Sequence, residues 1–580
     1  MEFDVIVRNG EVIDGSGKPR SKQDVGLKGD SIAAVGNLEG ATAPITVDAA
    51  GQVVTPGFID MHSHADQTIL VYPYAQSFIG QGITTTVCGQ CGFSPAPLNK
   101  HYAVTWWEFN WWDMVEKRKY DREVVGDLGK ARKAAKEVAG LDMNWSTFGE
   151  WLGRLDSDGI GLNIAPLVGH STIRAAVMGT DYRRHATKDE IDAMKRYVEE
   201  AMDSGAQGIS DGMDYAPNSY CAPEESVEVI GVAAKKGGLF STHWRRTGLR
   251  EGFGNPGLIQ GLKEAIEIAR KTGAKFEVAH LGSGYQILPS STPKLTALAA
   301  EETLAVIDDA VKSGVDLTFD VIPNSQGGGV GYSKYLASPL SPWLKEAGSM
   351  EKFADNLRAP DLRNEIRQFI MSGKWYSLNP IVQPGWANAI LISKSKADGI
   401  AGKTLAEVAA KRGEHALDTL MDIIMEDPWT TTGLRKGDEA TKQMFLKHQR
   451  AMVAIDTFVV DETYEGKNPP YPLPSHNTFG GMARYLSLYA VPEVLGLEEG
   501  VRRLTGFPAE RLGLSDRGTI AVGKKADIVV FKPEAVKDVT TDDEPRRYPE
   551  GFSWVFVNGV AAMENGKLKL TRSGRALRRK

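Results

Sequence analysis

The middle of the chain alternates short apolar runs with helical segments, and no other feature limits the fold as strongly. The runs include LNIAPLVGH, KFEVAHLG and VDLTFDVIP. Segments with helical spacing of apolar residues separate such runs, among them residues 187–205, 258–273 and 301–314, each ending at a glycine. Strands that alternate with helices build parallel sheets from βαβ units. Eight such units over roughly 250–400 residues predict an α/β fold with a (β/α)8 barrel of the TIM type.

The two ends of the chain have a different texture, in which apolar and polar residues alternate and Asn-Gly pairs recur. This texture predicts short antiparallel strands joined by tight turns. Because it occurs at both ends, we expect one small β-sandwich domain built from residues 1–55 and 512–570. The barrel then spans residues 56–511, with insertions at about 101–150 and 327–411 that do not follow its rhythm and that form an inserted subdomain.

Composition narrows the class of protein. The chain has 580 residues, 42% of them hydrophobic, which is too long for one simple core and ordinary for a globular protein. A net charge of −6 argues against nucleic acid as a partner, and the basic end (Arg575, Arg578, Arg579 and Lys580) predicts a solvated tail. The start has no signal-peptide pattern, and no apolar run of about 18 residues predicts a membrane span. Three cysteines in a chain of this length fit a reducing compartment, so we expect a cytoplasmic protein. With nucleic acid and membranes disfavoured, a small-molecule partner is expected and a homo-oligomer stays open.

The segment PGFIDMHSHAD carries the strongest chemical signal. His62 and His64 follow an apolar run, and a strand with side chains at period two places both imidazoles on one face. Two neutral imidazoles side by side favour a cation between them, and zinc is the usual one. By itself the pair supports a metal site and a strand with two surface histidines equally well.

Further chemistry-bearing residues end apolar runs in the same way. Cys91 follows ITTTV, His243 ends GLFSTH, His280 ends KFEVAH, and Asp320 and Asp456 end LTFD and MVAID. The carboxyl ends of barrel strands meet at one rim, where barrel enzymes carry their active sites. Histidines, a cysteine and carboxylates at successive strand ends therefore favour a metal site.

The sequence resembles a known family at several motifs. PGFIDMHSHAD resembles the metal motif of the amidohydrolase superfamily, and QGITTTVCGQCGFSPAPL, APLVGHSTIRAAVMG and GTIAVGKKADIVVF are similar to N-acyl-D-amino-acid deacylases, the D-aminoacylase family. The resemblance covers most of the chain, both ends included. It implies a (β/α)8 barrel with a small β-sandwich formed by the two termini.

The resemblance also implies roles for individual residues. One zinc is expected to be held firmly and a second conditionally, with a cysteine in the place of the carbamylated lysine that bridges the metals in many superfamily members. Zinc lowers the pKa of bound water to about 7 and polarises a carbonyl. Asp456 would accept the proton of the attacking water and return it to the departing amine, a role worth roughly 10²–10⁴-fold in rate. The implied metal ligands are His62, His64, Cys91, His243 and His280.

Other residues near these motifs allow two interpretations each. Arg245 or Arg246 binds an anionic substrate group or forms a salt bridge, and His170 touches the site or is a structural histidine. Asp320 is an acid behind the metal ligands or a helix cap. The tentative substrate-binding residues are Tyr215, Arg245, Tyr285 and His476.

One cysteine of a CxxC pattern and one tryptophan-rich segment are expected to serve packing. Cys88 and Cys91 form a CxxC pair, but no second pair completes a zinc finger, so Cys88 is expected to pack in the core. The segment WWEFNWW in the first insertion is expected to pack in a core or between subunits, with an aromatic lid as the alternative.

The chain departs from the family pattern where the substrate is expected. In the deacylases a segment with HPR supplies an arginine to the substrate carboxylate, whereas this chain has Ser475-His476 there. HLGSGY and IPN stand where the family commonly has HHKxxG and YPY. The metal set is thus intact while the acid-binding set has changed.

The predicted function is therefore that of a zinc-dependent hydrolase of a non-peptide C–N bond, similar to the N-acyl-D-amino-acid deacylases. A cyclic amide or ureide hydrolase of the hydantoinase kind is the main alternative. An amidase for an aromatic amide without the carboxylate and a metal-dependent decarboxylase are further alternatives.

Overall fold

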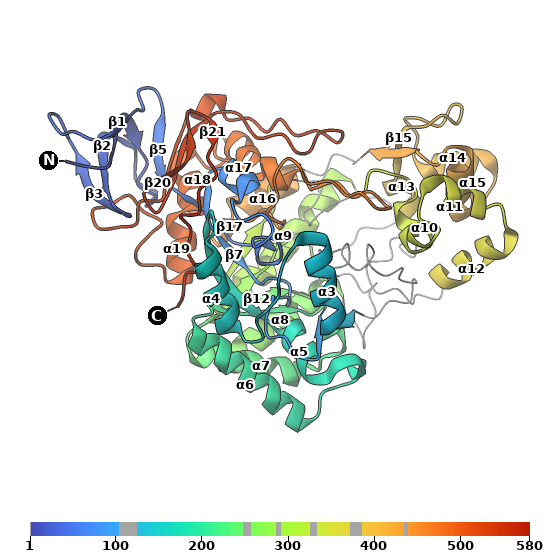
Figure 1. Cartoon of the computed structure of the whole chain (residues 1–580). Helices are drawn as coiled ribbons and strands as arrows, with labels where there is room; N and C mark the ends of the chain where they lie inside the picture. The colour runs from blue at the N-terminus through green and yellow to red at the C-terminus, as the bar shows by residue number, and fades with distance from the viewer. Residues whose placement is uncertain are drawn as a thin grey trace.

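A parallel barrel forms the centre of the molecule (Figure 1). The fold comes from a computed structural model that describes residues 2–103, 124–246, 257–285, 292–324, 333–371, 385–433 and 439–579. Its eight strands are hydrogen-bonded in the order β17-β14-β13-β12-β11-β10-β7-β6, and every pair is parallel. The strands are β6 (Phe58–Asp60), β7 (Ile83–Cys88), β10 (Asn163–Gly169), β11 (Gly208–Gly212), β12 (Leu239–His243), β13 (Lys275–Val278), β14 (Leu317–Val321) and β17 (Ala451–Val453).

Backbone hydrogen bonds bring the first and last barrel strands together. The amide of Met61, just after β6, donates to the carbonyl of Val453 in β17 at 3.2 Å. The amide of Asp456 donates to the carbonyl of His62 at 2.8 Å. These bonds bring the ends of the sheet together, and the predicted (β/α)8 barrel is confirmed.

Helices surround the barrel as the sequence pattern predicts. α6 (Lys188–Ser204) and α8 (Leu258–Thr272) match two predicted segments to within a residue. α9 (Pro293–Lys312) begins eight residues earlier than predicted, because Thr292 accepts a hydrogen bond from the Leu295 amide as an N-cap and proline suits the first helical position. Further helices of this layer are α4 (Phe148–Asp158), α5 (His170–Met178), α7 (Pro223–Lys235), α16 (Glu439–Lys447), α17 (Asn477–Leu488), α18 (Leu497–Leu504) and α19 (Gly506–Leu512).

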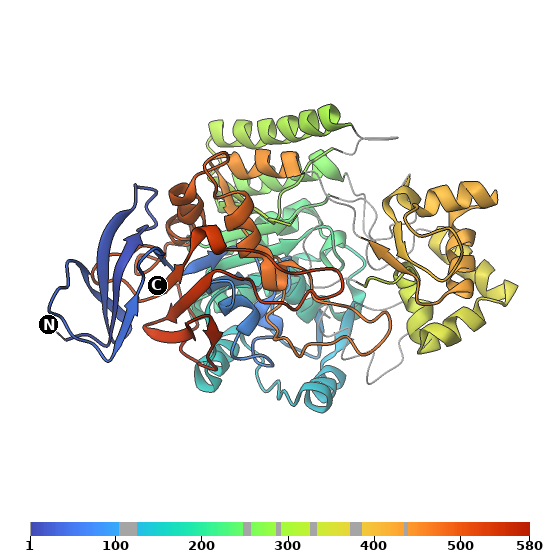
Figure 2. The same ribbon diagram turned by 90° about the horizontal axis from the view of Figure 1, so that it is seen from above.

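Both ends of the chain contribute to one nine-stranded sheet, which lies beside the barrel in both views (Figures 1 and 2). The antiparallel pairing of β5 with β18 joins the two halves, and Val7, Val54 and Ile528 share one core between them. The separate β domain is thus present, while its predicted limits at residues 55 and 512 stay a prediction. The strands are β1 (Val5–Val12), β2 (Ser21–Lys28), β3 (Ser31–Gly36), β4 (Ile45–Asp48), β5 (Val53–Pro56), β18 (Ile528–Phe531), β19 (Phe552–Val557), β20 (Val560–Glu564) and β21 (Lys567–Leu568).

The second insertion forms a lobe of its own on the opposite side of the barrel from the β domain (Figures 1 and 2). Its side chains, among them Leu344, Ile366 and Leu420, form a hydrophobic core separate from that of the barrel. Because α15 packs in this core, we propose that the lobe extends to about residue 433 instead of the predicted 411. Its elements are α10 (Ser341–Ala347), α11 (Met350–Asn356), α12 (Pro360–Met371), α13 (Trp386–Ala389), β15 (Leu391–Lys394), α14 (Leu405–Arg412), α15 (Ala416–Glu426) and β16 (Thr431–Gly433).

The first insertion is described only in part. β8 (His101–Ala103) pairs with β9 (Val125–Asp127), and α3 (Leu128–Ala139) follows. The tryptophan-rich segment lies outside the described residues. No described helix has the length and apolar character that a membrane crossing requires. All three cysteines are free and buried.

The basic end of the chain is not the solvated tail that its composition predicts. The amide of Leu577 donates to the carbonyl of Ile164 in β10 at 2.7 Å, so the tail runs against a barrel strand. Arg575 Nη1 lies 2.8 Å from Asp30 Oδ2 in the β domain. A count of basic residues gives no information about backbone partners of this kind, so the prediction was wrong for the described part of the tail.

We expect Gly574→Ala to destabilise the protein through this tail. A Cβ at Gly574 would lie 2.0 Å from the carbonyl oxygen of Leu162, and forced overpacking of this kind costs about 1–3 kcal/mol. Gly153→Ala in α4 is the matched control, because its Cβ would meet no atom within 4 Å and alanine favours helix. Thermal unfolding measures both variants. A Gly574→Ala midpoint at or above that of the wild type would show that the tail does not contribute to stability.

Candidate metal centre

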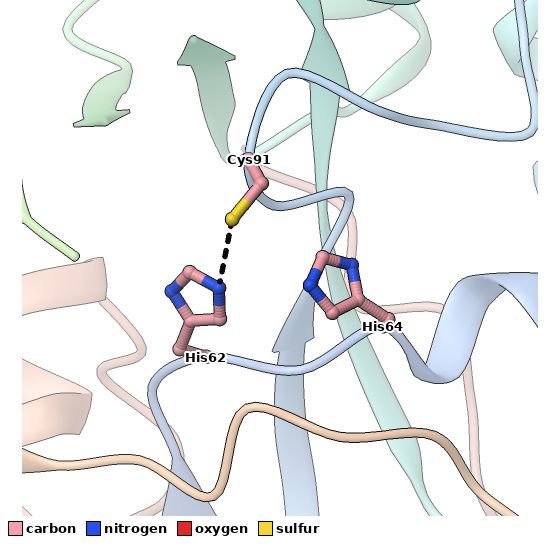
Figure 3. Close-up of side chains that lie close together, drawn as sticks. All are labelled: His62, His64 and Cys91. Carbon is pink, nitrogen blue, oxygen red and sulfur yellow. Dashed lines mark hydrogen bonds between the residues drawn. The ribbon is translucent and has the colours of Figure 1, made fainter. Parts of the chain in front are cut away.

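His62 and His64 lie side by side and face the sulfur of Cys91 (Figure 3). His62 Nε2 is 3.4 Å from Cys91 Sγ, and all three side chains are buried. β6 ends at Asp60, so the two histidines occupy the segment after the strand and not the strand itself. They nevertheless point to the same side, as the sequence predicts.

Cys91 also faces the histidines of two other strands. His243 is the last residue of β12, and His280 follows β13. Cys91 Sγ is 3.7 Å from His243 Nδ1 and 3.7 Å from His280 Nε2, and these two nitrogens are 3.1 Å apart. The sulfur thus lies between two groups of imidazoles.

Asp456 brings a carboxylate to the same point. Its Oδ1 lies 3.3 Å from His64 Nε2 and 3.5 Å from His62 Nε2. Asp320 lies behind these residues: its Oδ2 is 3.6 Å from the other ring nitrogen of His62, and its Oδ1 accepts a hydrogen bond from the His280 amide at 2.7 Å. Of its two predicted roles, Asp320 therefore has that of an acid behind the histidines.

The distances suit a tetrahedral zinc site. Zn–N bonds of about 2.0–2.1 Å and Zn–S bonds of about 2.3 Å place neighbouring ligand atoms roughly 3.3–3.8 Å apart. The nitrogen–sulfur distances of 3.4 and 3.7 Å fall in this range. Within the described part of the chain, the groups that could hold a metal include His62/His64/Cys91, Cys91/His243/His280 and His62/His280/Asp456.

The charges of these groups also fit a cation. Burial raises the pKa of the Cys91 thiol, but His62 and His64 outweigh it and bring the pKa below its usual range. Burial lowers the pKa of His64, but its contacts with Asp456 and Cys91 raise it overall to about 9. Protons on the imidazoles therefore balance the thiolate and the carboxylate, and a divalent cation at the same point would replace those protons.

Three residues of this site have a strained backbone. Cys91, His280 and Asp456 have φ values of 55°, 37° and 48°, in the left-handed region that non-glycine residues rarely adopt. Strain of this kind costs on the order of 1–3 kcal/mol per residue and persists at functional sites because the surrounding structure enforces it. Here it accompanies the three side chains that contribute a sulfur, a nitrogen and a carboxylate.

Sequence reasoning missed acids that support the site. Asp60 accepts hydrogen bonds from the amides of His62 at 3.3 Å and Ile455 at 3.0 Å. It therefore connects the segment that carries the histidine pair with the segment that carries Asp456. Asp214 Oδ2 lies 3.6 Å from His243 Nε2 and supports that ring from outside. The period of two in FIDMH places Asp60 with His62, and this signal was available in the sequence.

The predicted substrate residues occupy different environments. The hydroxyl of Tyr215 lies 3.0 Å from His243 Nδ1, at the centre. Tyr285 is 38% exposed beyond β13. His476 is engaged through both ring nitrogens, with Thr540 Oγ1 at 2.9 Å and Asp542 Oδ1 at 3.0 Å.

Arg245, which the sequence suggested as a substrate-binding residue, instead contacts other parts of the protein. It is buried, and its Nε lies 3.1 Å from Glu264 Oε2. Its other two nitrogens donate to the carbonyl oxygens of Met213, Ser219 and Cys221. With every nitrogen engaged by the protein, Arg245 holds the β11 and β12 loops together, which is the salt-bridge role of its two predicted interpretations.

His170 likewise belongs to a buried ionic network. Its ring lies 3.3 Å from Asp211 Oδ2 and 3.5 Å from Glu225 Oε1, and Arg174 donates to both oxygens of Glu225. Burial lowers the pKa of His170, but Asp211 raises it overall to about 9. His170, Cys221 and Glu225 come close enough to hold a metal, yet the protonated imidazole and Arg174 already neutralise the acids.

Comparison with known proteins agrees with this geometry. The sequence pattern of the family described as "Amidohydrolase family" matches residues 46–323 and 393–562, well over half of the chain. This chain belongs to the amidohydrolase family. The amidohydrolase is 30% identical over 578 residues to D-aminoacylase of Alcaligenes xylosoxydans xylosoxydans, with 100% of this chain and 98% of the relative covered. The predicted resemblance to the D-aminoacylases is confirmed.

Two solved structures extend the likeness to the fold. A D-aminoacylase studied for the role of its binuclear metal centre, with one-metal activation and second-metal attenuation, has a TM-score of 0.68 at 30% identity. The N-acyl-D-glutamate deacylase of Bordetella bronchiseptica, in complex with zinc and a phosphonate mimic of the tetrahedral intermediate, has a TM-score of 0.67 at 25% identity. Each comparison covers 100% of both chains. The amidohydrolase therefore shares its overall fold with these two enzymes.

We expect Cys91→Ala to lower the transition-metal content of the purified amidohydrolase by at least one equivalent, because the sulfur faces both groups of histidines. Cys88→Ala is the matched control: this thiol is also buried, and burial raises its pKa well above the usual range. Elemental analysis of both variants gives the metal content. Equal metal content in Cys91→Ala and Cys88→Ala would remove Cys91 from the ligand set.

Proposed function

We propose that this amidohydrolase removes the acyl group from N-acyl-D-amino acids by zinc-dependent hydrolysis. The likeness to a D-aminoacylase over the whole chain supports this substrate class. The observation that carries the proposal is the position of Asp456, whose Oδ1 lies 3.3 Å from His64 Nε2 and 3.5 Å from His62 Nε2. A carboxylate in this position is close to any metal that the histidines bind and to a water molecule on that metal.

We assign the firmly held zinc to Cys91, His243 and His280 and a second, conditional metal to His62 and His64. Their short mutual distances support the first assignment. The one-metal activation of the related D-aminoacylase supports an enzyme that works with a single metal. Zinc, when bound, lowers the pKa of a water molecule to about 7 and polarises a carbonyl group.

Asp456 is the proposed general base and acid. Burial raises the pKa of its carboxyl, but His62 and His64 outweigh it and bring the pKa well below the usual range. The carboxylate is therefore ionised at neutral pH and can accept the proton of the water that attacks the amide carbonyl. It then returns the proton to the departing nitrogen, which cannot leave as an anion.

Tyr215 is the proposed substrate contact at the reacting carbonyl. Its hydroxyl lies beside His243, and its ring packs against Phe93, with centroids 6.1 Å apart. A buried tyrosine fixed in this way presents its hydroxyl with little loss of conformational freedom. We propose that it donates a hydrogen bond to the carbonyl oxygen as negative charge develops there.

Asp456→Asn is expected to reduce the turnover of N-acetyl-D-amino acids by roughly 10²–10⁴-fold, because an amide cannot accept and return the proton. Metal content and the thermal midpoint should stay close to those of the wild type. Initial rates and elemental analysis on the same preparation test this. Near-normal turnover with metal retained would exclude Asp456 from the proton transfer.

The substrate class is tested with a small panel. We expect hydrolysis of N-acetyl-D-amino acids, slower hydrolysis of the L enantiomers, and little of hydantoin or dihydrouracil. Release of free amine is measured for the linear amides and ring opening for the cyclic ones. Faster turnover of the cyclic compounds would favour the hydantoinase-like alternative, and release of carbon dioxide would favour a decarboxylase.

A further inference from the structure

Arg246 is unusual because its cationic side chain faces a histidine of the metal centre. The outer ring nitrogens of two other histidines of the centre lie near carboxylates, His62 near Asp320 and His243 near Asp214. The outer nitrogen of His280 instead lies 3.4 Å from Nη1 of Arg246. A cation thus occupies the place where a carboxylate would be expected.

Once His280 serves as a ligand, Arg246 has no side-chain acceptor among the described residues. A neutral imidazole has one nitrogen with a lone pair and one with a hydrogen. If Nε2 of His280, which faces Cys91, gives its lone pair to a metal, Nδ1 carries the hydrogen and cannot accept from Arg246. A guanidinium keeps its charge at any relevant pH. Among the described residues, Arg246 has no ion-pair partner.

A second cation lies close by. Lys442 is in α16, which packs against β14 and β17. Burial, together with the charges of Arg246 and Arg484, lowers the pKa of Lys442 to about 8, although Glu439 opposes the shift. Glu439 is itself paired with Arg484 at 2.5 Å. Within the described part of the chain Lys442 forms no hydrogen bond or ion pair, so positive charge is in excess here.

Half-buried cations without partners are costly unless an anion from outside joins them. We propose that Arg246 and Lys442 form an anion subsite that binds the carboxylate on the amine side of the substrate. The inference rests on the proposed deacylase function and names the residues that select its substrate. It assigns to the segment after β12 and to α16 a task that the family pattern places at the position of Ser475-His476 in this chain.

The position of Arg246 suits such a carboxylate. Its guanidinium and the proposed ligand nitrogen of His280 lie on opposite sides of one imidazole ring. In an N-acyl amino acid, the carboxylate is separated from the reacting carbonyl by the nitrogen and the α-carbon, which is a comparable span. His476 cannot take the role in its present contacts, because Thr540 and Asp542 engage both its ring nitrogens.

The test uses the metal-bearing protein with Asp456→Asn, so that ligands bind without turnover. Calorimetry compares N-acetyl-D-alanine with its neutral carboxamide. We expect the acid to bind at least tenfold more tightly than the carboxamide. Adding Arg246→Met should weaken binding of the acid by roughly 10–100-fold, the range for a lost charge-assisted hydrogen bond, and change binding of the carboxamide little.

Further variants separate charge recognition from packing. Lys442→Met should weaken binding of the acid by roughly 3–10-fold, and Arg246→Lys should restore part of the preference because it keeps the charge. Arg270→Met is the matched control, since Arg270 is an exposed cation at the end of α8 that pairs with Glu267. It removes one charge and should leave both affinities unchanged.

The outcomes are distinguishable from failure of the proposed function. If Arg246→Met binds the acid as tightly as its parent, or loses acid and carboxamide equally, the anion subsite is wrong. If the binding pattern holds but the wild type hydrolyses no N-acetyl-D-amino acid, the subsite stands and the deacylase proposal fails.

Discussion

The structure depends on the electrostatic balance around one sulfur. Cys91 lies between His62 on one side and His243 and His280 on the other, with the Asp456 carboxylate nearby. Buried anions of this kind are unfavourable without positive charge close by. Positive charge on His62 and His64 offsets these anions, and a divalent cation would take over that role with its ligands deprotonated. The fold and the proposed chemistry are linked at this point.

Barrel closure is what brings these groups together. The segments after β6 and β17 meet through the bond from the Asp456 amide to the His62 carbonyl, and the amide of His64 donates to the carbonyl of Thr457 at 2.9 Å. The histidine pair and Asp456 are therefore fixed to each other by backbone and not by side chains alone. The left-handed φ of Asp456 is part of the same arrangement, since a relaxed backbone would turn the carboxylate elsewhere.

The distribution of acids and cations behind the histidines divides the site into two functional parts. Asp320 and Asp214 support His62 and His243, where carboxylates orient rings and strengthen them as ligands. On the His280 side the neighbour is Arg246, whose charge also acts on Lys442. Carboxylates thus lie behind His62 and His243, whereas positive charge that would attract an anion lies behind His280.

The sequence by itself determined the barrel, the presence of the helices around it, and the histidines, the cysteine and the aspartates at the strand ends that converge. Strand ends in a parallel barrel meet at one rim, so a histidine or aspartate at the end of an apolar run needs no tertiary information to be placed there. Only the tertiary structure decided which of two adjacent arginines is engaged. Arg245 turns into the β11 loop and pairs with Glu264, whereas Arg246 turns to His280, and no local pattern distinguishes them. The docking of the basic tail and of α15 was likewise decided by partners remote in sequence, because hydrogen bonds and packing between distant segments leave no periodic signal in either one.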